Sequence, residues 1–133
     1  MKTIHLYLTA FIVTLLSLQT HVFAEQSTTN KTAPAIRSIT MTNIEYEGTK
    51  VWLPGVIVAK KGERVQLKLI NKAPSGAHGF AIPAFKVEVV VPKATEETPF
   101  TTIEFVASES GLFPFFCHMH AAHVGGQVLI LDK

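Results

Sequence analysis

The sequence predicts an all-β protein, a Greek-key β-sandwich of seven or eight strands that follows a signal peptide. Three observations lead to this fold class. Short runs of β-branched and aromatic residues recur, turn signals separate them about every 8–12 residues, and no helical periodicity persists beyond one turn. Strands of this kind pack as two sheets within a single domain.

The first predicted strands are residues 51–53 and 56–58, two β-branched runs separated by the turn pair Pro54-Gly55. After a polar turn, residues 64–70 alternate between polar and apolar side chains. Such alternation is typical of a strand that buries one face. The buried face of this strand is predicted to consist of Val65, Leu67 and Leu69.

A loop rich in Pro, Ser and Gly is predicted over residues 71–79. Near the end of the chain, Gly125-Gly126 turns the backbone into the last strand. The remaining strands are predicted over residues 80–82, 87–91, 101–106, 111–117 and 127–131.

The space between the two sheets is expected to be filled by apolar side chains of these strands. We interpret the aromatic residues among them as core rather than as cofactor contacts. The predicted core is Trp52, Val56, Val58, Val65, Leu67, Leu69, Phe80, Ile103, Phe105, Val128 and Ile130.

The N-terminus has the pattern of a secretory signal peptide over residues 1–24. Lys2 provides a positive start, residues 4–18 are mainly apolar, and Val22-Phe23-Ala24 resembles a cleavage site. Residues 25–34 are polar without periodicity and are predicted to form a flexible tether before a domain at 35–133. We therefore expect a periplasmic protein with no stable membrane span after cleavage.

Charge and cysteine content exclude some functions. The net charge is only +2 and no basic run occurs, which argues against nucleic acid as a partner. The single cysteine cannot form a disulfide within the chain. It is therefore a metal ligand, a reactive thiol, an intermolecular bridge or a buried apolar residue.

Metal ligation is favoured because three histidines lie within six residues of Cys117. One thiolate with several imidazoles is the ligand set of a mononuclear transition-metal site, copper above all. Cys117, His120 and His123 are spaced so that all three can turn onto one ion. His78 is the fourth candidate if the loop that carries it lies at the same end of the sandwich. His118 adjoins Cys117 and is expected to point away, toward solvent or a partner.

These segments resemble the cupredoxin family, in its nitrosocyanin-like and plastocyanin-like branch. The resemblance implies His78, Cys117 and His120 as the three equatorial copper ligands, with His123 where many members have Met; Met119 is an alternative axial ligand. A second cysteine, which a two-copper centre needs, is lacking. The matching segments are residues 71–79 with His78 near the end, Phe115-Phe116-Cys117, His120 and Val124-Gly125-Gly126-Gln127-Val128.

Copper, one ion per domain, is the expected cofactor, and zinc is the alternative because one Cys with three His can close a tetrahedral zinc site. The predicted function is one-electron transfer with a transient protein partner. Copper carriage between a donor and an acceptor is the second possibility, and small-molecule redox catalysis the third. The motif contains no acid or base residue for catalysis, which favours a carrier over an enzyme. The oligomeric state is left open.

An apolar surface around the ligand loop is expected to dock the partner. It is predicted to consist of Ala121, Ala122 and Val124, with Phe80 and Pro83 nearby.

Overall fold

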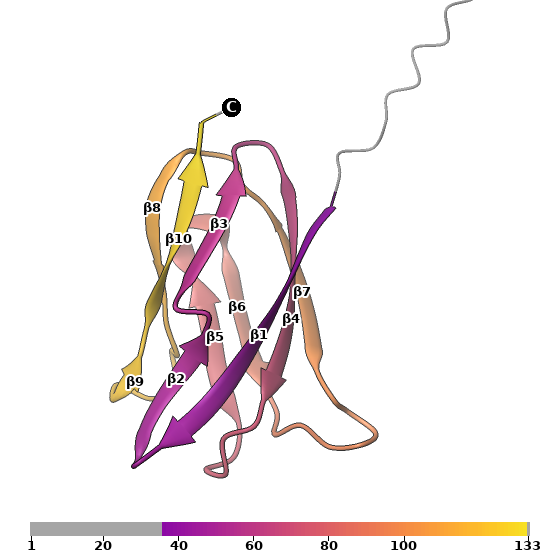
Figure 1. Ribbon diagram of the computed structural model, residues 1–133, viewed down its shortest axis with the longest axis vertical. Helices are drawn as coiled ribbons and strands as arrows, with labels where there is room; N and C mark the ends of the chain where they lie inside the picture. The colour runs from indigo at the N-terminus through magenta and orange to yellow at the C-terminus, as the bar shows by residue number, and fades with distance from the viewer. Residues whose placement is uncertain (1–35, 133) are drawn as a thin grey trace, which may run out of the picture. The chain divides into compact units, whose positions relative to one another are not determined.

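The computed structural model of the chain describes residues 36–132, which confirm the predicted all-β sandwich (Figure 1). The predicted signal peptide and tether, residues 1–34, lie outside the described residues. No helix among the described residues is long and apolar enough to cross a membrane. The elements are β1 (Ile36–Tyr46), β2 (Thr49–Leu53), β3 (Val56–Lys60), β4 (Arg64–Asn71), β5 (His78–Ile82), the 3-10 turn η1 (Pro83–Phe85), β6 (Val87–Val91), β7 (Thr101–Val106), β8 (Gly111–Phe115), β9 (His123–Val124) and β10 (Gly126–Leu131).

Two of these strands, β1 and β9, were not among the eight predicted runs. Strand β1 pairs with β2 and also with β4, so it lies in the middle of the larger sheet. Strand β9 is only two residues long and forms through its pairing with β2. A strand of two residues is too short to show the alternation of polar and apolar side chains by which strands are recognised in a sequence.

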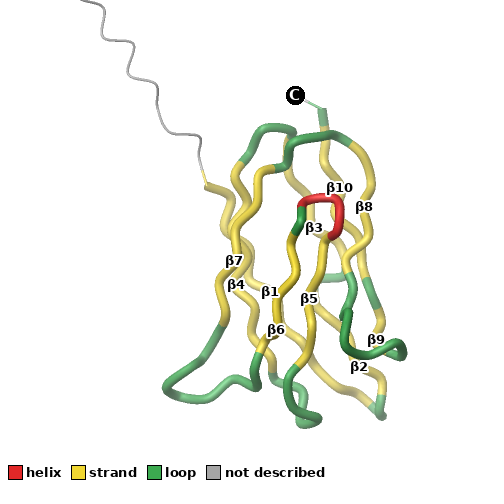
Figure 2. The backbone as a smooth tube through the Cα atoms, turned by 180° about the vertical axis from the view of Figure 1, so that it is seen from behind, coloured by secondary structure: helices red, strands yellow, loops and turns green. Residues whose placement is uncertain are grey.

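The strands form two layers. One is a five-stranded sheet in the order β7-β4-β1-β2-β9, and the other contains β3-β10-β8. The pair β5-β6 continues the second layer, because the backbones of Ala81 and Phe116 exchange two hydrogen bonds of 2.9 and 3.1 Å. Figure 2 shows η1, in red, closing the link between β5 and β6.

The core lies between the layers and contains nine of the eleven residues predicted for it. Alternate residues of β4 are buried, as predicted, and Ile103 is partly buried against them. Large side chains complete the core: Met41, Phe115 and Ile82 are fully buried beside Trp52 and Phe80. The predicted core positions confirmed as buried or packed against the core are Trp52, Val65, Leu67, Leu69, Phe80, Ile103, Phe105, Val128 and Ile130.

The prediction for β3 was wrong about which face is buried. Val56 and Val58 are 52% and 43% exposed, whereas Ile57 and Ala59 are in the core. The reason is the register with β10, in which Ile57 lies opposite Val128 and Ala59 opposite Ile130. Cross-strand partners share a face, and a shift of one residue exchanges the two faces of a strand. A run in which every residue is apolar does not reveal this choice.

The fold positions the candidate site at the end of the sandwich where β2 and β9 lie (Figure 1). His78 is the first residue of β5, so the preceding loop is shorter than predicted. Cys117 follows β8 in one layer, and His123 begins β9 in the other. The segment from Cys117 to His123 therefore connects the two layers over a short distance.

Candidate metal centre

His78 provides the clearest candidate ligand atom. Its side chain is fully buried at the start of β5, and its Nε2 lies 3.1 Å from Ser75 Oγ. Its Nδ1 is also buried, yet has no hydrogen-bond partner in the described part of the chain. A buried polar atom without a partner is costly, by about 1–3 kcal/mol. An atom of this kind is explained if it binds something that the polypeptide itself does not provide.

The sulfur of Cys117 lies next to this nitrogen and is likewise shielded. The residue is 5% exposed, and its Sγ accepts a hydrogen bond of 3.2 Å from the backbone N–H of Gly79. The Nδ1 atom of His120 lies 3.4 Å from the same sulfur. An N–H aimed at sulfur stabilises the thiolate, the form that binds metal.

Gly79 is a residue that the sequence analysis did not single out. A Cβ at this position would lie 2.6 Å from Nδ1 of His118, whose ring packs on the glycine backbone. The Gly79 carbonyl accepts a 3.1 Å hydrogen bond from Trp52 Nε1, so both backbone groups of the glycine are engaged. The Nε2 atom of His118 lies 4.0 Å from Glu88 Oε1, and His118 is not part of the group of candidate ligands.

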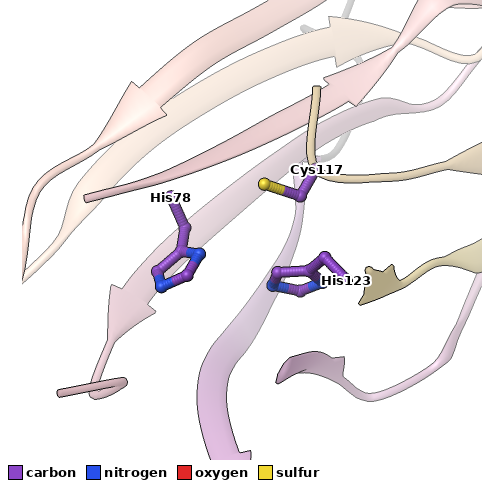
Figure 3. Close-up of side chains that lie close together, drawn as sticks. All are labelled: His78, Cys117 and His123. Atoms are coloured by element: carbon purple, nitrogen blue, oxygen red, sulfur yellow. The ribbon is translucent and has the colours of Figure 1, made fainter. Parts of the chain in front are cut away.

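His123 completes a compact group with His78 and Cys117. Each of the three offers one ligand atom, and these atoms lie within 4.8 Å of one another (Figure 3). In Figure 3 the sulfur and the two rings surround one common space. The ring of His120 is close as well, with its centroid 4.8 Å from that of His78. All four predicted ligands are therefore brought together.

The two nitrogens of His123 both face oxygen atoms. Nε2 lies 2.9 Å from Asn43 Oδ1, and Nδ1 lies 3.1 Å from the Val124 carbonyl oxygen. A neutral imidazole has one N–H and one lone pair, so only one of these contacts is a hydrogen bond. The ring is 7% exposed and stacks on Trp52 with a centroid separation of 6.3 Å.

A buried pair of amides decides which nitrogen of His123 carries the proton. Asn71 Nδ2 donates to the carbonyls of Gly76 and Val91, so its Oδ1 is the atom that accepts from Asn43 Nδ2. Asn43 must then present its Oδ1, an acceptor, to His123. Consequently Nε2 of His123 is the protonated nitrogen, and its lone pair is on Nδ1 beside the Val124 carbonyl.

Asn43 and Asn71 were also missed by the sequence analysis, although a signal exists. Asn71 continues the alternation that buries Val65, Leu67 and Leu69, so an amide occupies an inward position of β4. Buried amides are normally hydrogen-bonded, and a polar residue at an inward position indicates a partner nearby. Asn43 lies opposite Asn71 in β1, two residues after the buried Met41.

Electrostatics keep the two buried imidazoles neutral. Burial lowers the pKa of His78, and the nearby His120 and His123 lower it further. Burial is also the main cause that lowers the pKa of His123, although its Val124 contact acts in the opposite direction. A neutral ring is the form that ligates a metal, so no proton has to be displaced at neutral pH.

Most of the remaining predicted residues lie on the surface, with one exception. Met119 is 44% exposed and does not join the group, and Ala121, Ala122 and Val124 are exposed around the same loop. Phe80, predicted to contribute to an apolar docking surface, is fully buried, so that prediction was wrong. Its ring packs edge-on against Trp52 in the core, which leaves it no access to a partner.

The donor set fits copper. It combines one sulfur, a buried nitrogen of His78 that has no partner among the described residues, and a second imidazole nitrogen 3.4 Å from the sulfur. Sulfur and imidazole nitrogens suit both copper and zinc, and copper binds such sites more tightly than other divalent ions.

Comparisons with known proteins agree with this fold. A family model described as "Cupredoxin-like domain" matches residues 7–130. No curated protein sequence matches the chain. Similar solved structures include a copper-containing nitrite reductase from Thermus scotoductus SA-01, at 20% identity and a TM-score of 0.52, over 74% of this chain and 28% of that one.

A multicopper oxidase is similar at 14% identity and a TM-score of 0.61, over 74% of this chain and 45% of that one. Another, from Pseudomonas thermotolerans, is similar at 10% identity and a TM-score of 0.56, over 75% of this chain and 30% of that one. The chain therefore spans less than half of the length of each of these proteins. At such identities the likeness concerns the fold.

Proposed function

Because the chain belongs to the cupredoxin family, we propose that it binds one copper ion between His78, Cys117, His120 and His123 and transfers single electrons. The observation that carries this proposal is the buried Nδ1 of His78, which has no partner among the described residues and adjoins a shielded sulfur. Bound copper would supply a one-electron redox couple at this position.

In this proposal the four residues have different roles. Nδ1 of His78, Sγ of Cys117 and Nδ1 of His120 form the strong ligand set, and the Gly79 N–H limits the charge on the sulfur. His123 is a weaker fourth ligand, because its Nδ1 lone pair is directed toward the Val124 carbonyl oxygen and the ring must turn from there to bind. The identity of the weak fourth ligand tunes the spectrum and the reduction potential of cupredoxin sites.

The rigidity of the ligand set favours electron transfer. His78 begins a strand that is buried throughout, and Cys117 is fixed by the Gly79 N–H and by the Phe116–Ala81 backbone bonds. Ligands held in this way move little when the oxidation state changes, so the exchange of an electron requires little rearrangement.

The surface beside His120 favours contact with a partner. Phe116, Met119 and Val124 are 38–48% exposed and lie within four residues of the partly buried His120 in the sequence. A small apolar surface of this kind suits a transient redox partner. We place the encounter in the periplasm, on the basis of the signal-peptide pattern in residues 1–24.

Copper carriage is the second candidate, and Met119 favours it. This thioether is exposed next to His120, where it can contact copper before or after the buried ligands do. Thioethers are soft ligands that select Cu(I), so Met119 would suit transfer from a donor protein.

One experiment separates these functions. The purified protein is loaded with Cu(II) and examined by visible absorption, electron paramagnetic resonance and titration with a reductant. Electron transfer predicts one copper per chain, an intense thiolate-to-copper band and reversible reduction with metal retained. Loss of copper to a chelator within minutes would favour carriage, and preferential binding of zinc would contradict both.

A further inference from the structure

Ser75 connects His78 to a carboxylate that lies outside the ligand group. Ser75 Oγ is 2.7 Å from Glu45 Oε2 and 3.1 Å from His78 Nε2. Glu45 belongs to β1, and its other oxygen, Oε1, lies 3.6 Å from Lys50 Nζ of the neighbouring strand. The ring of His78 is thus the end of a chain of contacts that begins at a β-hairpin.

The direction of each hydrogen bond follows from the number of protons available. An ionised carboxylate only accepts, so the single hydroxyl proton of Ser75 is donated to Glu45. Ser75 Oγ then has only lone pairs for His78, and Nε2 of His78 must donate to it. The proton of the neutral ring is therefore on Nε2, and the lone pair is on Nδ1.

This assignment agrees with an independent observation. Nδ1 of His78 is the buried atom for which the described residues provide no hydrogen-bond donor or acceptor. If Nδ1 carried the proton, a buried N–H would have no acceptor, while the lone pair of Nε2 would face an oxygen whose proton is already donated. Both defects disappear when Nε2 carries the proton.

We propose that Glu45 and Ser75 act as a positioning relay that fixes His78 in its Nε2-protonated form and thereby presents Nδ1 to the metal. The negative charge at Glu45, transmitted through the hydroxyl, increases the basicity of the ring, as carboxylates behind ligating histidines do. A more basic ligand stabilises Cu(II) more than Cu(I), so the relay also lowers the reduction potential. The effect on copper rests on the proposed function, whereas the protonation of the ring does not.

The first test uses the metal-free full-length protein. Nitrogen-15 NMR of the histidine rings should show His78 protonated at Nε2 alone in the wild type. In Glu45→Gln the amide can donate to Ser75, whose hydroxyl is then free to turn toward His78, and a mixture of the two ring forms is expected. Glu47→Gln, the same change in the adjoining turn, is the matched control and should leave His78 unaltered.

The second test measures the metal. Ser75→Ala and Glu45→Gln should each weaken Cu(II) binding by about 10- to 100-fold and raise the reduction potential, with Glu47→Gln unchanged. If Ser75→Ala does not fold, Glu45→Gln, which keeps the shape of the side chain, decides alone.

A wild-type ring protonated at Nδ1 would overturn the relay, as would a Glu45→Gln ring identical to that of the wild type. A protein with the expected ring form that binds no copper would support the relay and overturn the proposed function.

Discussion

The two fully or nearly buried histidines of the site, His78 and His123, are held in similar ways but differ in what they offer. Each has its Nε2 engaged with an oxygen, through Ser75 for His78 and directly with Asn43 for His123. The lone pair of His78 faces no protein partner among the described residues, whereas that of His123 lies beside the Val124 carbonyl. Both rings are buried within the same group of candidate ligands, so we expect the partners of their nitrogens to distinguish the stronger ligand from the weaker one.

Strand β1 supports both rings. Asn43 and Glu45 are two residues apart, so their side chains point to the same face of the sheet. Asn43 reaches His123, and Glu45 reaches Ser75 beside His78. One strand thus provides an amide for one histidine and a carboxylate for the other, and the contrast between the two rings can be tested from either side.

The largest effect should come from removing each ring in turn. His78→Ala is expected to weaken Cu(II) binding by more than about 100-fold, beyond the range of supporting residues. His123→Ala should weaken it by only about 10-fold, because the lone pair of that ring is directed toward the Val124 carbonyl oxygen. Competition with a chelator measures both, and circular dichroism checks that both variants fold. Equal losses would contradict the distinction between the two histidines.

The next effect should follow from Asn43→Ala, which releases Nε2 of His123. The metal-free protein should lose about 1–3 kcal/mol of stability for each buried group left unpaired, measured by urea denaturation. In the copper protein the loss of this support, like the loss of Ser75 behind His78, should weaken ligation by His123 and change the visible spectrum. His123→Met, which replaces the imidazole by a weak thioether, should shift the spectrum further in the same direction. Spectra unchanged in both variants would remove His123 from the ligand set.

A smaller effect is expected from Gly79→Ala, on the His78 side. The added methyl group would meet the ring of His118 and displace the N–H that Cys117 accepts. We expect a loss of about 1 kcal/mol, at the low end for overpacking because the ring is near the surface, and a shifted thiolate band. The double variant Gly79→Ala/His118→Ala removes the clashing ring and should recover most of the loss. If the double variant is no more stable than Gly79→Ala alone, the loss of stability comes from strain in the backbone and not from the ring of His118.

The smallest effect should be on the pH dependence of the metal-free protein. The pKa values of His78 and His123 are both lowered from 6.5 by burial. Below pH 6.5 the unfolded chain therefore binds more protons than the folded one. The free energy of unfolding then decreases as the pH is lowered. The contribution of the two rings is complete above pH 6.5 and is lost as the pH decreases from there through the folded-state pKa values. Urea denaturation at pH 5 and 7.5 measures it, and His78→Gln should show a weaker dependence.

Much of the fold could be predicted because its strands alternate visibly. The run from Val65 to Leu69 showed its inward face directly, while β3, with apolar residues on both faces, did not. The candidate ligands could be named from the sequence because a cysteine flanked by histidines has few structural explanations. Their grouping with His78 depended on the family resemblance, which placed two distant loops at the same end.

The supporting residues could not be predicted, for a physical reason. Asn43, Glu45 and Ser75 act by hydrogen bonds between segments up to 80 residues apart, and their own neighbours in the sequence give no sign of these partners. The direction of each bond also depends on the whole network, since the amide of Asn43 is oriented by Asn71 and that of Asn71 by two carbonyls. A local pattern contains no such information.

Trp52 is the only tryptophan of the chain, and its position has a practical consequence. The indole is fully buried, donates to the Gly79 carbonyl and stacks on His123, so it touches both halves of the site. Its fluorescence should therefore have the blue-shifted maximum of an apolar environment and should be quenched when Cu(II) occupies the site. The molecule thus contains its own optical reporter, by which the uptake, release and reduction of metal can be followed in real time without a label.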